Sequence, residues 1–231
     1  MQGGSFRLLN RAARYFPILR EIGQLVDLNN GCRVLEVGSG SIGLGEFWAH
    51  EFVGCDLLFP GKPRAPMRAV RCSGAKLPFA DEYFDVVVAS DVMEHVPPEW
   101  RQTVVAETLR VSRAVAVFGY PCGPAAHALD RRIRDRYLRR KMSPPIWLQE
   151  HMTNAFPDEE LFSDVHGGWK VKSIPNENLD FHHRLMQAEM YRPLDYLFRI
   201  GLLVVPRLIE KFLQRMDREP SYRKIFILSK Q

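Results

Sequence analysis

The fold of this chain of 231 residues is decided by VLEVGSGSIG at residues 34–43 and FVGCD at residues 52–56. The first stretch opens with a strand that is apolar except for Glu36, a pattern typical of strands covered on both faces. Its three glycines form a G-x-G-x-x-G turn, where the missing Cβ atoms let the backbone lie close to a ligand. Asp56 ends the second strand, where a carboxylate can accept hydrogen bonds from ribose hydroxyls. Together these features predict a parallel α/β unit that binds a nucleoside, although a glycine pattern alone is of low specificity.

Two further features distinguish between the cofactors that use such a unit. Glu36 stands two residues before the first glycine, where its charge would repel a pyrophosphate but attract a cationic amino group. The stretch LPFADEYFDVVVASDVMEHV at residues 77–96 resembles the corresponding run of class I S-adenosylmethionine (SAM) methyltransferases of the type 11 branch. The resemblance covers roughly residues 30–120, and its motifs are specific in combination.

This resemblance implies a Rossmann-like α/β fold. We expect a seven-stranded, mostly parallel sheet with an antiparallel strand at the edge, an N-terminal helix and a helical insertion before the last strand. The strands are expected at Arg33–Val37, Phe52–Asp56, Met67–Cys72, Phe84–Ala89, Ala114–Tyr120, Trp169–Ile174 and Arg223–Ser229. Helices are expected at Phe6–Leu28, kinked or split by Pro17, at Glu99–Val111 and at Asp130–Met142.

The resemblance also implies which residues bind SAM. Asp56 is expected to take the ribose. The methionine part is expected to lie against Glu36, Gly38, Ser39 and Gly40.

The family usually places an acid-alanine pair beside the adenine, and here Gly74 and Ala75 stand in that position. The acid is therefore missing. We expect backbone groups at Ala75 to contact the adenine edge while Leu57 and Leu77 pack against its faces.

The loop after the fourth strand supplies the remaining cofactor contacts. Ser90 and Asp91 are expected at the floor of the pocket near the sulfonium. His95 also belongs to this loop; its expected role is to cap or pack the following helix, and catalysis is the lesser alternative.

The acceptor side is predicted around Trp147, Glu150 and His151, which lie in a segment flanked by prolines. We interpret Glu150 and His151 as catalytic candidates on a lid, because a histidine with a near-neutral pKa can remove a hydroxyl proton. The alternative is an exposed pair on a helix. His127 and Asp130 are lesser candidates beside them.

Other chemistries are disfavoured. Cys122 follows the fifth strand, whereas cytosine-C5 methyltransferases carry their nucleophile after the fourth, and the aromatic Asn/Asp-Pro-Pro motif of amino methyltransferases is missing. Nucleic acid is therefore not an expected partner. His182 and His183 have no second ligand cluster at metal spacing, so no metal is expected.

Composition and charge describe the rest of the chain. A hydrophobic content of 46% fits one domain, and four cysteines without C-x-x-C pairing fit a reducing cytoplasm. No signal peptide is recognised, so we expect a cytoplasmic protein that is soluble or peripheral to a membrane. The single domain 1–231 is divided into a helical extension (1–30), a cofactor-binding core (31–123), a basic helix with a lid (124–166) and a helical insertion (176–219).

The second half of the chain carries the positive charge. Residues 1–115 hold 13 basic and 13 acidic residues, whereas residues 116–231 hold 19 and 14. The apolar surface of the insertion has three possible destinations: the domain's own core, a homodimer partner, or an anionic membrane.

These observations favour a SAM-dependent methyltransferase acting on a small-molecule, glycan or lipid-linked acceptor. The alternative is a catalytically silent SAM-binding regulatory or scaffold protein, and an NAD-dependent oxidoreductase ranks third.

Overall fold

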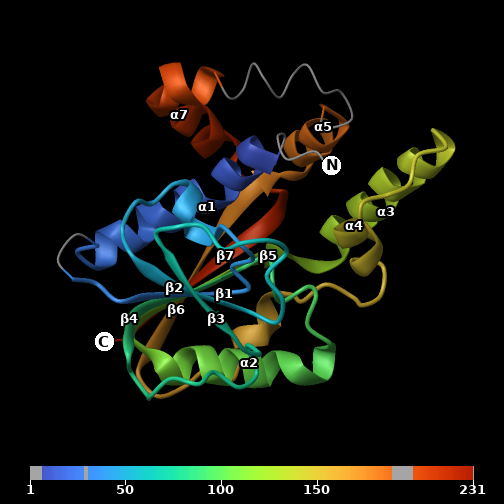
Figure 1. Ribbon diagram of the computed structural model, residues 1–231. Helices are drawn as coiled ribbons and strands as arrows, with labels where there is room; N and C mark the ends of the chain where they lie inside the picture. Colours follow the sequence, from blue (N-terminus) through green and yellow to red (C-terminus); the bar gives the residue numbers. More distant parts are fainter. Residues whose placement is uncertain (1–6, 29–30, 189–199, 231) are drawn as a thin grey trace.

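One seven-stranded sheet organises the chain in the computed structural model, which describes residues 7–28, 31–188 and 200–230 (Figure 1). The strand order is β3-β2-β1-β4-β5-β7-β6. The strands are β1 (Val34–Val37), β2 (Phe52–Asp56), β3 (Met67–Arg71), β4 (Phe84–Ser90), β5 (Ser112–Pro121), β6 (Trp169–Asn178) and β7 (Ser221–Lys230).

The topology confirms the predicted fold. Strands β1 to β5 pair in parallel, and β7 runs antiparallel to both β5 and the edge strand β6. All seven residues of β4 are buried, and its apolar run Val86–Ala89 is typical of a central strand with both faces covered. The order reverses beside β1, so a crevice is expected where β1 and β4 end.

Helices cover both faces of the sheet, and Figure 1 shows α1 on one side and α2 on the other. On α1 (Arg7–Leu25), Tyr15, Ile18 and Ile22 are buried against strand residues. The helix is continuous through Pro17, so the expected split does not occur. On α2 (Pro98–Val111), Val104 and Val105 pack into the opposite layer.

The segment after β5 begins its helix earlier than predicted. The expected start was Asp130, but α3 (Gly123–Arg139) begins directly after the strand, with Pro124 in its first turn, where proline is favoured. The short α4 (Ile146–Glu150) follows, and both project from the end of the sheet in Figure 1. Short 3-10 turns occur at η1 (Gly43–Glu46) and η2 (Glu159–Phe162).

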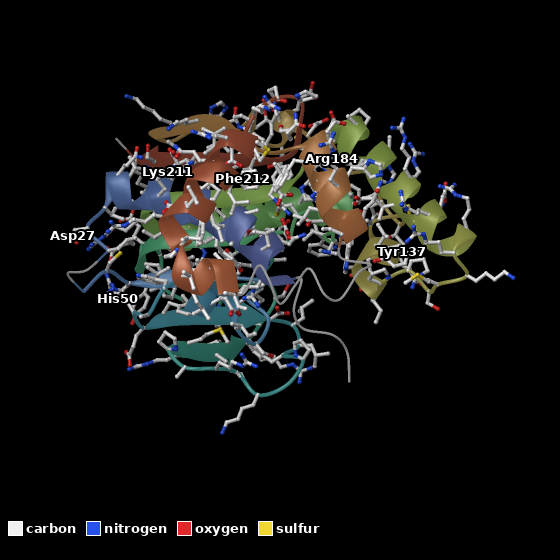
Figure 2. The ribbon with its side chains drawn as sticks, turned by 90° about the horizontal axis from the view of Figure 1, so that it is seen from above. Asp27, His50, Tyr137, Arg184, Lys211 and Phe212 are labelled. Atoms are coloured by element: carbon white, nitrogen blue, oxygen red, sulfur yellow. The ribbon has the colours of Figure 1, made fainter. Side chains whose placement is uncertain are left out.

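The predicted insertion contains α5 (Leu179–Ala188) and α7 (Pro206–Met216), while residues 189–199 lie outside the described part. In Figures 1 and 2, α7 lies against α1, and its Leu213 is buried in the cluster shared with that helix. Lys211 and Phe212, labelled in Figure 2, remain exposed on α7. Among the described residues, no helix is long and apolar enough to cross a membrane. A dimer or membrane role for the exposed part stays a prediction.

Candidate functional site

A cavity of about 640 Å³ opens where β1, β2 and β4 end. Gly38 leaves β1 at its edge with φ of +73°, and a Cβ there would lie 2.3 Å from the Val92 side chain. Any other residue would have to displace the Val92 side chain and would be strained at this positive φ, so the position favours glycine. The sequence therefore turns sharply at the point where a ligand can approach the backbone.

Asp56 stands at the wall of this cavity and is tied to the glycine turn. Its carboxylate accepts hydrogen bonds from the backbone N–H of Gly40 (2.9 Å) and of Leu58 (3.2 Å). The predicted neighbours Leu57, Gly74 and Ala75 line the same cavity. These residues come from three separate segments, and the structure brings them together.

The adenine-side prediction needs one change. Leu77 does not line the cavity, because its side chain is buried in the core and its backbone N–H donates to Glu107. Trp100, at the start of α2, does line it and is 53% exposed, while Leu57 is 66% exposed. Leu57 and Trp100 therefore offer exposed apolar surfaces to a planar base.

Glu36 lies beneath the turn and outside the cavity lining. Its carboxylate accepts hydrogen bonds from the Tyr15 hydroxyl (2.5 Å) and the Leu44 backbone N–H (2.7 Å). Burial raises the pKa of Glu36 to about 7, against the lowering effect of these bonds and of Arg14. Glu36 therefore supports the glycine turn from beneath and does not line the cavity, where it was predicted to contact a ligand.

This placement predicts a pH-dependent stability. In the unfolded chain Glu36 loses its proton near its ordinary pKa of 4.5, whereas in the folded chain it keeps the proton up to about pH 7. The contribution of Glu36 to the free energy of unfolding is therefore full below pH 4.5 and is lost as the pH rises through about 7. Urea unfolding across this range should show a slope of up to about 1.4 kcal/mol per pH unit from this group. Glu36→Gln should remove this contribution to the slope, whereas Glu51→Gln, at an exposed position, should leave the slope unchanged. Identical slopes in wild type and Glu36→Gln would contradict this reading.

Three of the four predicted methionine-side residues, Gly38, Ser39 and Gly40, line a neighbouring hollow of about 590 Å³ that shares Gly38 and Asp56 with the first cavity. Ser39, Gly40 and Ser90 lie along it, together with Arg11 and Arg14 of α1. The two arginines were not predicted as site residues.

A second cavity of about 330 Å³ adjoins the first, because Asp91 and His95 line both. Its wall also carries His151, Trp147 and Glu94. A donor in the first cavity and an acceptor in the second would therefore meet at the loop after β4.

An ion-pair network fixes Asp91 between these cavities. Arg223 of β7 approaches its two carboxylate oxygens at 2.7 and 3.0 Å, and Arg14 lies at 2.7 Å. Burial alone would raise the pKa of Asp91, but the guanidinium groups of Arg223 and Arg14 hold it well below its usual range. Arg223 also pairs with the buried Glu177 at 3.2 Å. Asp91 is therefore a fixed anion with its charge balanced.

The predicted pair on α4 is divided between two environments. His151 is 4% exposed and lines the second cavity, so it is not part of an exposed pair, whereas Glu150 is exposed and reaches His95 Nδ1 at 3.2 Å. His151 Nδ1 lies 2.6 Å from Asp130, which also accepts a hydrogen bond from the Tyr222 hydroxyl. A carboxylate that accepts twice leaves the Nδ1 proton on His151 and the lone pair on Nε2.

Part of the sequence resembles known proteins. Residues 35–118 match a family model described as a methyltransferase domain. A protein described as an uncharacterized methyltransferase of Mycobacterium marinum is 44% identical over 97 residues, which cover 37% of each chain. The chain thus spans little more than a third of the length of this curated relative.

Solved structures resemble the whole fold at low identity. A SAM-dependent methyltransferase from Archaeoglobus fulgidus aligns with a TM-score of 0.50 at 18% identity, covering 98% of this chain and 95% of the other. The CurJ carbon methyltransferase aligns with a TM-score of 0.55 at 12% identity, covering 94% and 53%. At such identities the likeness concerns the fold.

Proposed function

We propose that this chain is a class I SAM-dependent methyltransferase and that it transfers the SAM methyl group to an acceptor in the second cavity. One observation carries the proposal: Asp91 and His95 line both cavities, so donor and acceptor would share a wall. In-line methyl transfer depends mainly on holding the two reactants in line at short distance. Two adjoining cavities supply that arrangement.

The residues of the first cavity fit the donor. The Asp56 carboxylate lines the first cavity, within reach of ribose hydroxyls. At Gly40, in the neighbouring hollow, nothing lies within 4 Å of the place of a Cβ, which leaves room for the amino-acid part. Leu57 and Trp100 offer apolar surfaces for the adenine, and the Ala75 backbone lies beside them. When bound, SAM supplies a methyl group activated by the sulfonium.

The second cavity favours a hydroxyl-bearing acceptor. The Nε2 lone pair of His151 is free to take a hydroxyl proton, and Asp130 stabilises the charge that the imidazole then carries. We therefore assign the acceptor-side role to His151, with Asp130 as the residue that positions it. The acceptor class we propose is a hydroxylated small molecule, or the hydroxyl-bearing end of a glycan or lipid-linked compound.

Methyl-labelled SAM tests the proposal. The protein is incubated with labelled SAM and fractionated cell extract, and labelled products are separated by mass. We expect a labelled product that forms with the wild type and drops strongly with Asp130→Asn. Binding of SAM with no label transferred from any fraction would favour the silent binder instead.

A further inference from the structure

Three metal-ligating side chains converge at the second cavity: Glu94, His95 and His151. One ligand atom from each lies within 4.8 Å of the others. We infer that this cluster binds a divalent transition-metal ion and that the ion holds the acceptor. The inference about the acceptor rests on the proposed function, whereas the metal site does not.

Glu94 is the first reason. Its side chain is 1% exposed, and neither carboxylate oxygen has a hydrogen-bond partner among the described residues. Its Oε1 lies 3.9 Å from His151 Nε2 and 4.0 Å from His95 Nε2, too far for hydrogen bonds. A buried carboxylate without partners is costly, and a cation among these three groups would compensate it.

The orientation of the two histidines is the second reason. Each has its Nδ1 beside an acid, His95 at Glu150 (3.2 Å) and His151 at Asp130 (2.6 Å). Both Nε2 atoms are thereby directed toward Glu94. Metal-bound histidines are oriented in this way, with one ring nitrogen donating to a carboxylate and the other on the metal.

The ligand set indicates the kind of ion. Two imidazoles and one carboxylate suit Zn²⁺ and related transition metals, whereas Mg²⁺ and Ca²⁺ prefer oxygen ligands alone. Three protein ligands leave a coordination position open, as in catalytic zinc sites. All three ligands line the second cavity or its edge, so that position faces the acceptor.

The ion would assume the task given above to the His151 lone pair. An acceptor hydroxyl bound to this ion would lose its proton to solvent, because the cation lowers the pKa of the hydroxyl. The oxygen then forms a bond to the methyl carbon as the carbon–sulfur bond breaks, and neutral S-adenosylhomocysteine leaves. His151 is a ligand in this form, and no redox step is needed.

The sequence did not reveal this cluster. No metal was expected, because the adjacent pair His182 and His183 lacked further ligands, and His182 Nδ1 in fact lies 2.6 Å from Glu177. The proposed ligands come from the loop after β4 and from the residue that caps α4. Folding alone brings these two distant segments together.

Calorimetric titration of Zn²⁺ into chelator-treated protein tests the site. We expect one ion per chain, with affinity reduced about 10- to 100-fold by Asp130→Asn, which alters only the residue behind His151. Glu94→Gln should reduce it at least as much, and the exposed His166→Ala should not change it. Cobalt(II) should give the absorption of a four- or five-coordinate ion in the wild type and lose it in Glu94→Gln.

Several outcomes would overturn the inference. These are less than one Zn²⁺ per chain, or equal affinity in wild type and Glu94→Gln when both still bind SAM and are therefore folded. Full methyl transfer by metal-free protein would refute the role of the ion while leaving the proposed function intact. Tight Zn²⁺ binding without any methyl transfer would refute the proposed function while leaving the metal site intact.

Discussion

Replacing Arg223 with methionine is expected to lower the free energy of unfolding by about 3–5 kcal/mol, the range seen when one partner of a buried ion pair is removed. Arg223 is 2% exposed and faces the carboxylates of Asp91 and Glu177. Among the described residues, its loss leaves Arg14 as the ion-pair partner of Asp91 and His182 as that of Glu177. Arg223→Lys keeps the charge but not the planar double contact, so it should lie between methionine and wild type.

Urea unfolding measures this effect, with Arg132→Met as the matched control. Arg132 is exposed on α3, so the same change there should shift stability by less than about 0.5 kcal/mol. Equal stabilities for Arg223→Met and Arg132→Met would mean that the network on Asp91 contributes little.

The second large effect is on turnover. His151→Asn is expected to reduce kcat about 10²- to 10⁴-fold, the usual contribution of a positioned acid or base, with SAM affinity nearly unchanged. Asp130→Asn should reduce it in the same direction, because it removes the acceptor of the His151 Nδ1 proton. The acceptor found with labelled SAM serves as substrate, and His166→Asn is the control. A normal kcat in His151→Asn would exclude His151 from the acceptor side.

The fold was predictable because its signals are local. The glycine turn after β1 and the apolar run of β4 each lie within a few residues, and Phe52–Asp56 was predicted with the bounds that β2 has. The predicted strand boundaries are less accurate where pairing with a neighbouring strand determines them. Strand β6 continues to Asn178 through its pairing with β7, four residues beyond the predicted Ile174.

The site was only partly predictable, because its electrostatics depend on tertiary contacts. Arg14 and Arg223 are ordinary basic residues in sequence, and only packing of α1 and β7 against the loop after β4 makes them partners of Asp91. Leu77 fits the family's motif, yet the chain turns it into the core and leaves Trp100 at the cavity. The burial of Glu36 likewise depends on a tertiary contact, because its hydrogen-bond donor Tyr15 lies on a helix that is distant in sequence.

Calorimetric titration of SAM, with NAD in parallel, shows whether the first cavity is a SAM site. We expect one SAM per chain and no response to NAD. Asp56→Ala should weaken SAM binding more than about tenfold, since two hydrogen bonds to an ionised acceptor are lost. Binding of NAD without SAM, or unchanged SAM affinity in Asp56→Ala, would contradict the assignment of the first cavity as the donor site.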